Sequence, residues 1–77
     1  MNVDELKKEL IRQGIPKDFY ALNGGLPNEA YCLDYSHNQW HVYYSERGCK
    51  TGMKSFEKEN DACKYMLSKL EDTKNIS

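Results

Sequence analysis

The sequence predicts an α+β domain: a helix, a three- to four-stranded antiparallel meander and a second helix, with both helices packed on one face of the sheet. Two observations carry this prediction. Apolar residues recur at helical spacing near both ends of the chain, and four runs rich in aromatic or branched residues lie between them, separated by turn-forming residues. Two amphipathic helices must cover their apolar stripes, and one face of the sheet offers the surface that does so.

The first predicted helix runs from Asn2 to Gln13. Its apolar stripe consists of Val3, Leu6, Leu10 and Ile11. Asn2 followed by Glu5 three places later is a variant of the capping box that begins many helices. Gly14 ends the helix because glycine adopts the left-handed conformation, and Pro16 prevents the helix from continuing.

Four runs form the predicted sheet: Phe19 to Leu22 as a short additional strand, Glu29 to Tyr35, Trp40 to Ser45, and Cys49 to Phe56. Alternation along the third run places Trp40, Val42 and Tyr44 on the core face. His41 and Tyr43 then lie on the opposite face of the sheet, which we expect to be left to solvent or to a partner.

Two glycine-containing segments are interpreted as turns. Asn23-Gly24-Gly25 separates the first two runs, and Glu46-Arg47-Gly48 separates the last two. The second link is so short that its flanking strands must be antiparallel neighbours. Gly24, Gly25 and Gly48 are therefore predicted to have structural roles, with Gly48 at a positive φ.

The second predicted helix runs from Lys58 to Leu70. Its apolar stripe consists of Ala62, Tyr65, Met66 and Leu70. The chain has 77 residues and a mass of 9.0 kDa, and it contains no internal repeat or linker. We therefore expect residues 1–77 to form a single domain that is ordered over about 2–70, with a loose tail at 71–77.

Composition limits the classes of function. Eleven Lys and Arg residues face 12 Asp and Glu residues, so the net charge is −1 and the chain lacks the basic excess of a domain that holds nucleic acid by charge alone. Its apolar runs are far shorter than the roughly 20 residues that cross a bilayer. Three widely spaced cysteines do not form a disulfide framework, so we expect reduced thiols and a cytoplasmic location.

The sequence contains no arrangement typical of a catalytic or metal site. No serine or cysteine has a recognisable base and orienting group, and Cys63 is interpreted as a packing residue. His37 and His41 are four residues apart, and Cys32 and Cys49 flank them, but no closely spaced cysteine pair accompanies them. We therefore predict a protein that is not an enzyme and uses no cofactor or metal.

Aromatic residues are concentrated on the second and third runs. Five of them fall within fourteen consecutive positions, namely Tyr31, Tyr35, Trp40, Tyr43 and Tyr44. Alternation cannot bury them all, and exposed Tyr and Trp favour either a partner surface or simple strand propensity. Both readings stay open. Asp34 and Glu46 lie nearby and would complement a basic partner.

Nucleic-acid binding is the alternative function. The order of helix, three strands and helix is also that of double-stranded-RNA-binding domains, and the last strand region carries Arg47, Lys50 and Lys54. The second helix, however, is preceded and begun by Glu57-Lys58-Glu59-Asn60-Asp61, which would repel phosphate. Lysines on an exposed strand also serve to prevent unwanted pairing of its edge.

Four stretches together carry a family resemblance. They are Leu22-Asn23-Gly24-Gly25-Leu26-Pro27-Asn28-Glu29-Ala30-Tyr31-Cys32, Trp40-x-Val42-Tyr43-Tyr44-Ser45-Glu46-Arg47-Gly48, Lys50-Thr51-Gly52-Met53-Lys54-x-Phe56, and Ala62-Cys63-Lys64-Tyr65. In these stretches the chain resembles the small immunity proteins encoded beside bacterial polymorphic or contact-dependent toxins. The resemblance implies a cytoplasmic antidote that binds its cognate toxin domain, frequently a nuclease, in a 1:1 complex without turnover.

The toxin interface that this resemblance implies lies on the open sheet face or at its edge. It consists of Tyr31, Asp34, Tyr35, His41, Tyr43, Glu46 and Arg47. Glu46 and Arg47 have two readings, as residues that shape the hairpin or as residues that reach into the toxin. Antidotes to basic nucleases are often strongly acidic, and the net charge of −1 leaves the class of toxin open.

Overall fold

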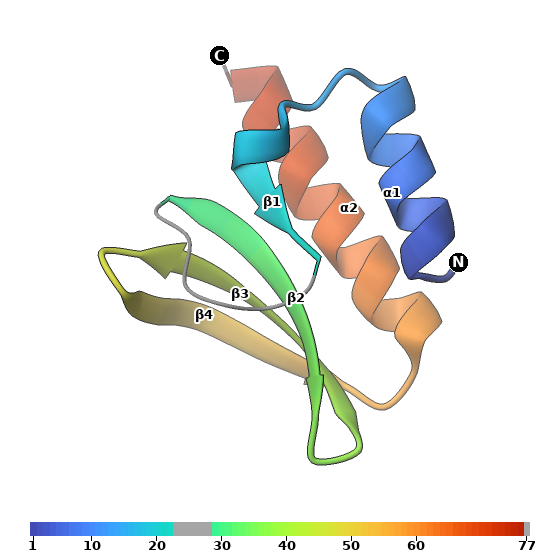
Figure 1. The fold of residues 1–77 in the computed structure, drawn as a ribbon, viewed down its shortest axis with the longest axis vertical. Helices are drawn as coiled ribbons and strands as arrows, with labels where there is room; N and C mark the ends of the chain where they lie inside the picture. The colour runs from blue at the N-terminus through green and yellow to red at the C-terminus, as the bar shows by residue number, and fades with distance from the viewer. Residues whose placement is uncertain (23–28, 77) are drawn as a thin grey trace.

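The computed structural model describes residues 1–22 and 29–76 and shows an α+β fold (Figure 1). Its elements are α1 (Val3–Arg12), the 3-10 turn η1 (Lys17–Phe19), β1 (Tyr20–Ala21), β2 (Ala30–Ser36), β3 (Gln39–Glu46), β4 (Cys49–Phe56) and α2 (Glu59–Ile76). Both helices lie on the same side of the sheet, as predicted. The second helix extends beyond its predicted end at Leu70.

The described strands form one four-stranded sheet in the order β1-β2-β3-β4. β3 is antiparallel to both β2 and β4, as the meander prediction requires. β1 is parallel to β2, with Tyr20 opposite Tyr31 and Ala21 opposite Cys32, so the prediction of a purely antiparallel sheet was wrong. Eight residues, 22–29, connect these two strands, whereas the hairpins use two-residue turns. A two-residue turn joins antiparallel strands, so the parallel pairing of β1 with β2 requires a longer connection than the hairpins use.

Two tight turns fix the register of the meander. His37 and Asn38 have φ values of 53° and 63° between β2 and β3. Arg47 and Gly48 have φ values of 51° and 78° between β3 and β4. Two consecutive residues with positive φ are the geometry of the type I′ turn, whose twist matches that of the flanking strands. The other two glycines predicted to form a turn, at 24 and 25, lie outside the described residues.

The ends of α1 are capped as its sequence predicts. The Asn2 side-chain oxygen accepts a hydrogen bond from the Glu5 backbone N–H at 2.8 Å. At the other end Gly14 has φ 75°, and the Ile15 N–H donates to the Leu10 carbonyl at 3.0 Å. This is the Schellman arrangement, which turns the chain back and brings Ile15 into the core.

The core of the described residues lies between the two helices and the sheet. It consists of Leu6, Leu10, Ile15, Leu33, Val42, Ala62, Cys63, Met66 and Leu70. Trp40 packs against the edge of this cluster, so Trp40 and Val42 face the helices, as strand alternation predicts. Burial of these apolar side chains provides the main favourable free energy of folding.

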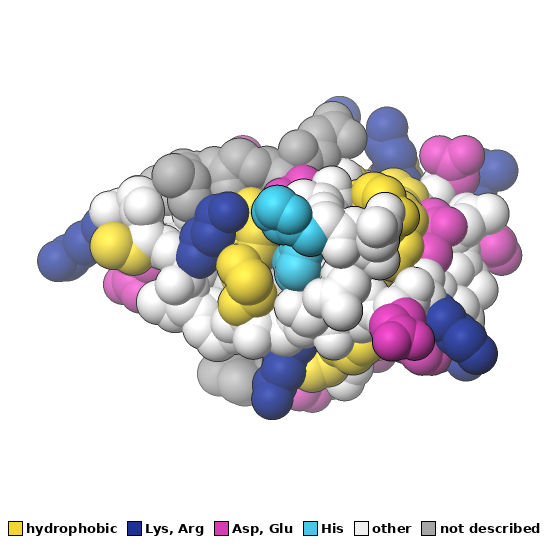
Figure 2. Space-filling view, turned by 90° about the horizontal axis from the view of Figure 1, so that it is seen from below, with side chains coloured by type: hydrophobic (Ala, Val, Ile, Leu, Met, Phe, Trp, Pro, Cys, Tyr) yellow, Lys and Arg dark blue, Asp and Glu magenta, His cyan; other side chains and the backbone are white. Residues whose placement is uncertain are grey.

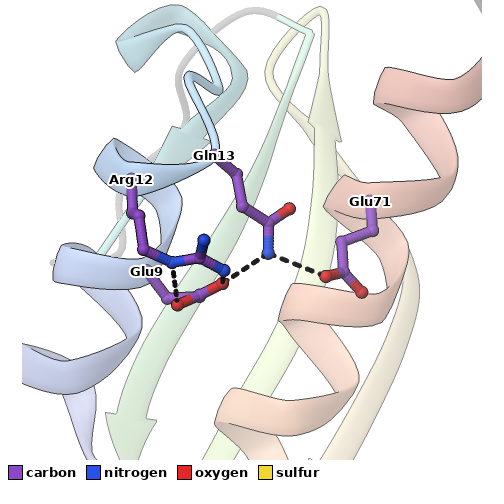
Figure 3. A network of polar contacts seen from close by, with 4 residues as sticks. All are labelled: Glu9, Arg12, Gln13 and Glu71. Carbon is purple, nitrogen blue, oxygen red and sulfur yellow. Dashed lines mark hydrogen bonds and ion pairs between the residues drawn. The ribbon is translucent and has the colours of Figure 1, made fainter.

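A polar network ties the end of α1 to α2 (Figure 3). The Gln13 side-chain amide donates to Glu9 at 2.7 Å and to Glu71 at 2.8 Å, so it bridges the two helices. Arg12 also donates to Glu9 and forms an ion pair with it. These hydrogen bonds, first from Arg12 and then from Gln13, lower the pKa of Glu9 to about 2.

Candidate functional site

The face of the sheet opposite the helices is closed at its centre. Cys32 is paired with Tyr43 across β2 and β3, and Ala30 is paired with Ser45. All four side chains are buried, and Tyr43 is only 1% exposed. Burial, together with the neighbouring Cys32, raises the pKa of Tyr43 to about 12. The predicted interface residue Tyr43 is therefore part of the folded interior, in contrast to the expectation of an open face.

His41 and Asp34 lie on that same face, nearer the β2–β3 turn, as opposed residues of the two strands. The His41 Nδ1 atom is 2.8 Å from the Ser55 hydroxyl oxygen. Its Nε2 atom is 3.1 Å from the Ser36 carbonyl oxygen. Because both ring nitrogens have partners in β2 and β4, the imidazole helps to hold three strands together.

Tyr35 is the most exposed aromatic side chain among the described residues, at 53%. Its ring packs on Trp40, with ring centroids 4.7 Å apart. Both lie next to the β2–β3 turn on the helix side of the sheet. Figure 2, which views the molecule from the end where this hairpin turns, shows histidine, hydrophobic and basic side chains next to one another.

Glu46 and Arg47 lie at the opposite end of β3, where the chain turns into β4, and both are exposed. The seven residues of the predicted interface consequently do not form one continuous surface. Tyr31 and Tyr35 lie on the helix side of β2, whereas Asp34 and His41 lie on the other face. The structure brings Asp34 and His41 together but separates them from Glu46 and Arg47 by most of the length of β3.

A groove that no sequence pattern predicts lies between α2 and the ends of the strands near the β3–β4 turn. We call it the aromatic groove; it is lined by Tyr31, Val42, Tyr44, Thr51, Gly52, Tyr65 and Lys69, and its volume is about 290 Å³. A second hollow of about 220 Å³ shares Tyr31 and Tyr44 with it and extends toward Phe19. The Tyr31 and Tyr44 rings meet edge to face, with centroids 5.0 Å apart.

The aromatic groove exists because the sheet diverges from α2. Figure 1 shows the β3–β4 hairpin directed away from the helix. Tyr44 and Tyr65 lie on the predicted core stripes of their elements, but at this end they are only partly buried. Lys69 contributes a positive charge, with its Nζ atom 5.4 Å from the centre of the Tyr65 ring. Periodicity predicts the face on which a residue lies but not the distance from that face to the next layer. It therefore assigned Tyr44 and Tyr65 to the core and did not predict the groove between them.

β4 forms the outer border of the aromatic groove and one edge of the sheet. All of its residues are exposed except Phe56, which is half-buried. Gly52 has φ 60°, and Gly52 and Met53 together stand opposite Tyr43, which makes a β-bulge. Lys50 lies on the face opposite the helices, with its Nζ atom 4.8 Å from the centre of the Tyr43 ring.

The potential metal-ligating and thiol side chains of the described residues are dispersed. Among them, no three His, Cys, Asp or Glu side chains gather as a metal site would require. Cys32 and Cys63 are buried, and burial raises the pKa of both thiols, that of Cys63 to about 11. No helix in the described part of the chain is long and apolar enough to span a membrane.

Comparison of the chain with protein-family models, with curated protein sequences and with solved structures gives no match.

Proposed function

We propose that this protein binds and neutralises a cognate bacterial toxin domain, without catalysis, as the small immunity proteins that it resembles do. The observation that carries the proposal is the surface formed by the exposed strand β4 and the aromatic groove beside it. Tyr side chains with an apolar ring and a polar tip are enriched among the residues that anchor protein interfaces. This surface offers three of them beside exposed backbone and basic side chains.

Tyr35 and Trp40 supply a second element of the proposed interface. Their rings pack on each other at a tilt near the tip of the β2–β3 hairpin, and Tyr35 is 53% exposed. An exposed aromatic side chain packed on a second ring is the type of residue that anchors protein interfaces. Tyr43, in contrast, is withdrawn from the proposed interface because it is buried.

Nucleic-acid binding is the second candidate, and the exposed basic residues Lys50 and Lys54 favour it. The start of α2 argues against it. Glu59 accepts a hydrogen bond from the Val3 N–H at 2.8 Å, and Asp61 adds a second acid in the first turn. The helix end that double-stranded-RNA-binding domains direct at phosphate is therefore acidic and engaged by α1.

The proposal is tested by co-expression with the product of the adjacent gene. We expect the tagged protein to retain this product in a 1:1 complex. We also expect it to restore the growth of cells that the adjacent gene product alone inhibits. Retention of RNA instead, with binding that weakens steeply as salt rises, would favour the nucleic-acid alternative. Absence of any rescue by a stably folded protein would reject the antidote role.

The contribution of the hairpin tip is tested by Tyr35→Ala. If Tyr35 anchors the partner, its loss should weaken binding by about 2 kcal/mol, or roughly thirtyfold. Ile11→Ala is the matched control, because Ile11 is an apolar residue of α1 with a similar exposed fraction, 56% against 53%. Equal affinities of the two variants in calorimetric titration would remove Tyr35 from the interface.

A further inference from the structure

The outer edge of β4 has the features of a site for an added strand. We propose that it receives an extended acidic segment of the partner protein, which pairs with β4 as a fifth strand and places an apolar side chain in the aromatic groove. This inference rests on the proposed function, because it names the surface that the bound partner covers and the chemistry of the segment that covers it.

The backbone of β4 is available for pairing. β4 is the last strand in the sheet order, and among the described strands it pairs only with β3. An edge strand directs alternate N–H and C=O groups outward, and an extended peptide that pairs with them gains main-chain hydrogen bonds. β1, at the other edge, has two residues, whereas β4 has eight. Of the two edges in the described part of the sheet, β4 is the one long enough to hold a strand of ordinary length.

The charge of β4 selects an acidic segment. Between Cys49 and Phe56 the strand carries Lys50 and Lys54 and no acidic residue. Opposite charges on neighbouring strands stabilise pairing, and like charges directly opposite destabilise it. Lys69 adds a third basic group on the side of the aromatic groove. Acidic side chains on the added strand would therefore meet a basic edge.

The same charges disfavour a second copy of this chain as the occupant. Two copies that pair through β4 would bring two basic edges together, because each strand carries Lys50 and Lys54 and no acidic residue. Lysines on an edge are a common protection against such self-pairing, and they leave the edge open to a complementary strand.

The aromatic groove gives the added strand a place for one of its side chains. Thr51 and Gly52 belong both to β4 and to the lining of the groove. Side chains of an added strand alternate between the two faces of the sheet, so some of them point to the helix side next to Gly52. A Cβ atom at Gly52 would have no atom within 4 Å apart from those of Gly52 and its chain neighbours, so the border of the groove is open at this point. An apolar side chain that enters there meets the rings of Tyr44 and Tyr65.

The test begins with a peptide probe. An acetylated and amidated peptide of eight residues, in which glutamate alternates with valine and leucine, is titrated into isotope-labelled protein and followed by backbone amide NMR. We expect resonances of β4 and of the aromatic groove to shift and the outward-pointing β4 amides to exchange more slowly with solvent. The same peptide with lysine in place of glutamate should leave them unchanged. Shifts confined to other surfaces, or equal effects of the two peptides, would overturn the proposal.

Pairing through the backbone is separated from simple charge attraction by two N-methylated forms of the acidic peptide. Each carries methyl groups on alternate residues, one on the odd and one on the even positions. Because only alternate amides of a strand point at its neighbour, one form should lose binding and the other should keep it. Equal affinities of the two forms would show that no strand is added. Tighter binding of a short RNA to the same residues would overturn the assignment to a protein segment.

The protein variant for this test is Lys50→Glu/Lys54→Glu. We expect its affinity for the acidic peptide to fall at least about tenfold, because the strand that attracts the glutamates would change from basic to acidic. Lys8→Glu/Lys64→Glu, on exposed helical positions, is the control with the same change in net charge. Circular dichroism of both variants checks that they fold. If the two variants lose affinity for the peptide equally, the loss comes from net charge and not from β4, and the proposal is overturned.

Growth rescue distinguishes the strand-addition site on β4 from the antidote role. If Lys50→Glu/Lys54→Glu neutralises the neighbouring toxic product as well as the wild type does, the β4 assignment fails and the antidote role stands. If the wild type binds the acidic peptide at β4 but rescues no growth, the antidote role fails and the strand-addition site stands. Loss of rescue in this variant alone, with rescue retained in Lys8→Glu/Lys64→Glu, supports both.

Discussion

β3 and β4 are neighbouring strands of equal length, and they have opposite relations to the rest of the molecule. β3 buries Val42 toward the helices and Tyr43 and Ser45 toward the other face. β4, which the structure describes throughout, buries none of its residues. The two strands share one hydrogen-bonded ladder, so their difference comes from what covers them. A strand covered on both faces provides stability, whereas an uncovered edge is free to provide contacts with a partner.

The largest expected contrast between the two strands is in the free energy of unfolding. Tyr43→Ala should cost about 3–5 kcal/mol, because it removes a buried aromatic ring. Met53→Ala removes a side chain of β4 that is 45% exposed and should cost less than about 0.5 kcal/mol. Urea denaturation of both variants measures the difference. Comparable losses would mean that β4 is as much a part of the core as β3.

Alkaline pH should reduce the free energy of unfolding through Tyr43 of β3. The folded-state pKa of Tyr43 is raised from 10.0 to about 12 by burial and by Cys32, so folding favours the neutral phenol. The corresponding stability, on the order of 2 kcal/mol, is fully present below pH 10 and is lost as pH rises from about 10 to 12. Unfolding free energies measured across this range should fall in the wild type and fall less in Tyr43→Phe.

The smallest expected effect on stability concerns the cysteines, because the thiol of β4 is exposed and the other two are buried. Cys49 of β4 is exposed, whereas Cys32 and Cys63 are buried with raised pKa values. A thiol reagent should therefore modify one cysteine quickly in the folded protein and all three in denaturant. Cys49→Ser should remove the fast phase and change the unfolding free energy by no more than about 0.5 kcal/mol. Fast modification of a second thiol would show that the core opens readily.

Much of the fold is predictable because its signals are local. Helical spacing identified α1 and α2, and turn residues separated the three long strands. Strand alternation placed Trp40 and Val42 on the helix side, where the structure has them. The parallel pairing of β1 was missed because it depends on a contact between Tyr20 and Tyr31, which no local pattern specifies.

The candidate site was less predictable for a different reason. Alternation placed Tyr43 opposite the core face, and it cannot report whether that second face is itself covered. In the same way, it assigned Tyr44 and Tyr65 to the core, but the distance between the sheet and α2 leaves a groove between them. Exposure at both places is set by the arrangement of layers, which depends on the whole chain.

The bridge from Gln13 to Glu71 has a consequence for the order of folding. It joins residues 58 positions apart, whereas the turns at His37-Asn38 and Arg47-Gly48 each close a loop of two residues. The entropy lost on closing a loop grows with its length, and contacts between distant residues form slowly. The β2–β3–β4 meander can thus nucleate by itself, and docking of α1 on α2 becomes the late step. Replacing Gln13 should then accelerate unfolding and leave the folding rate nearly unchanged.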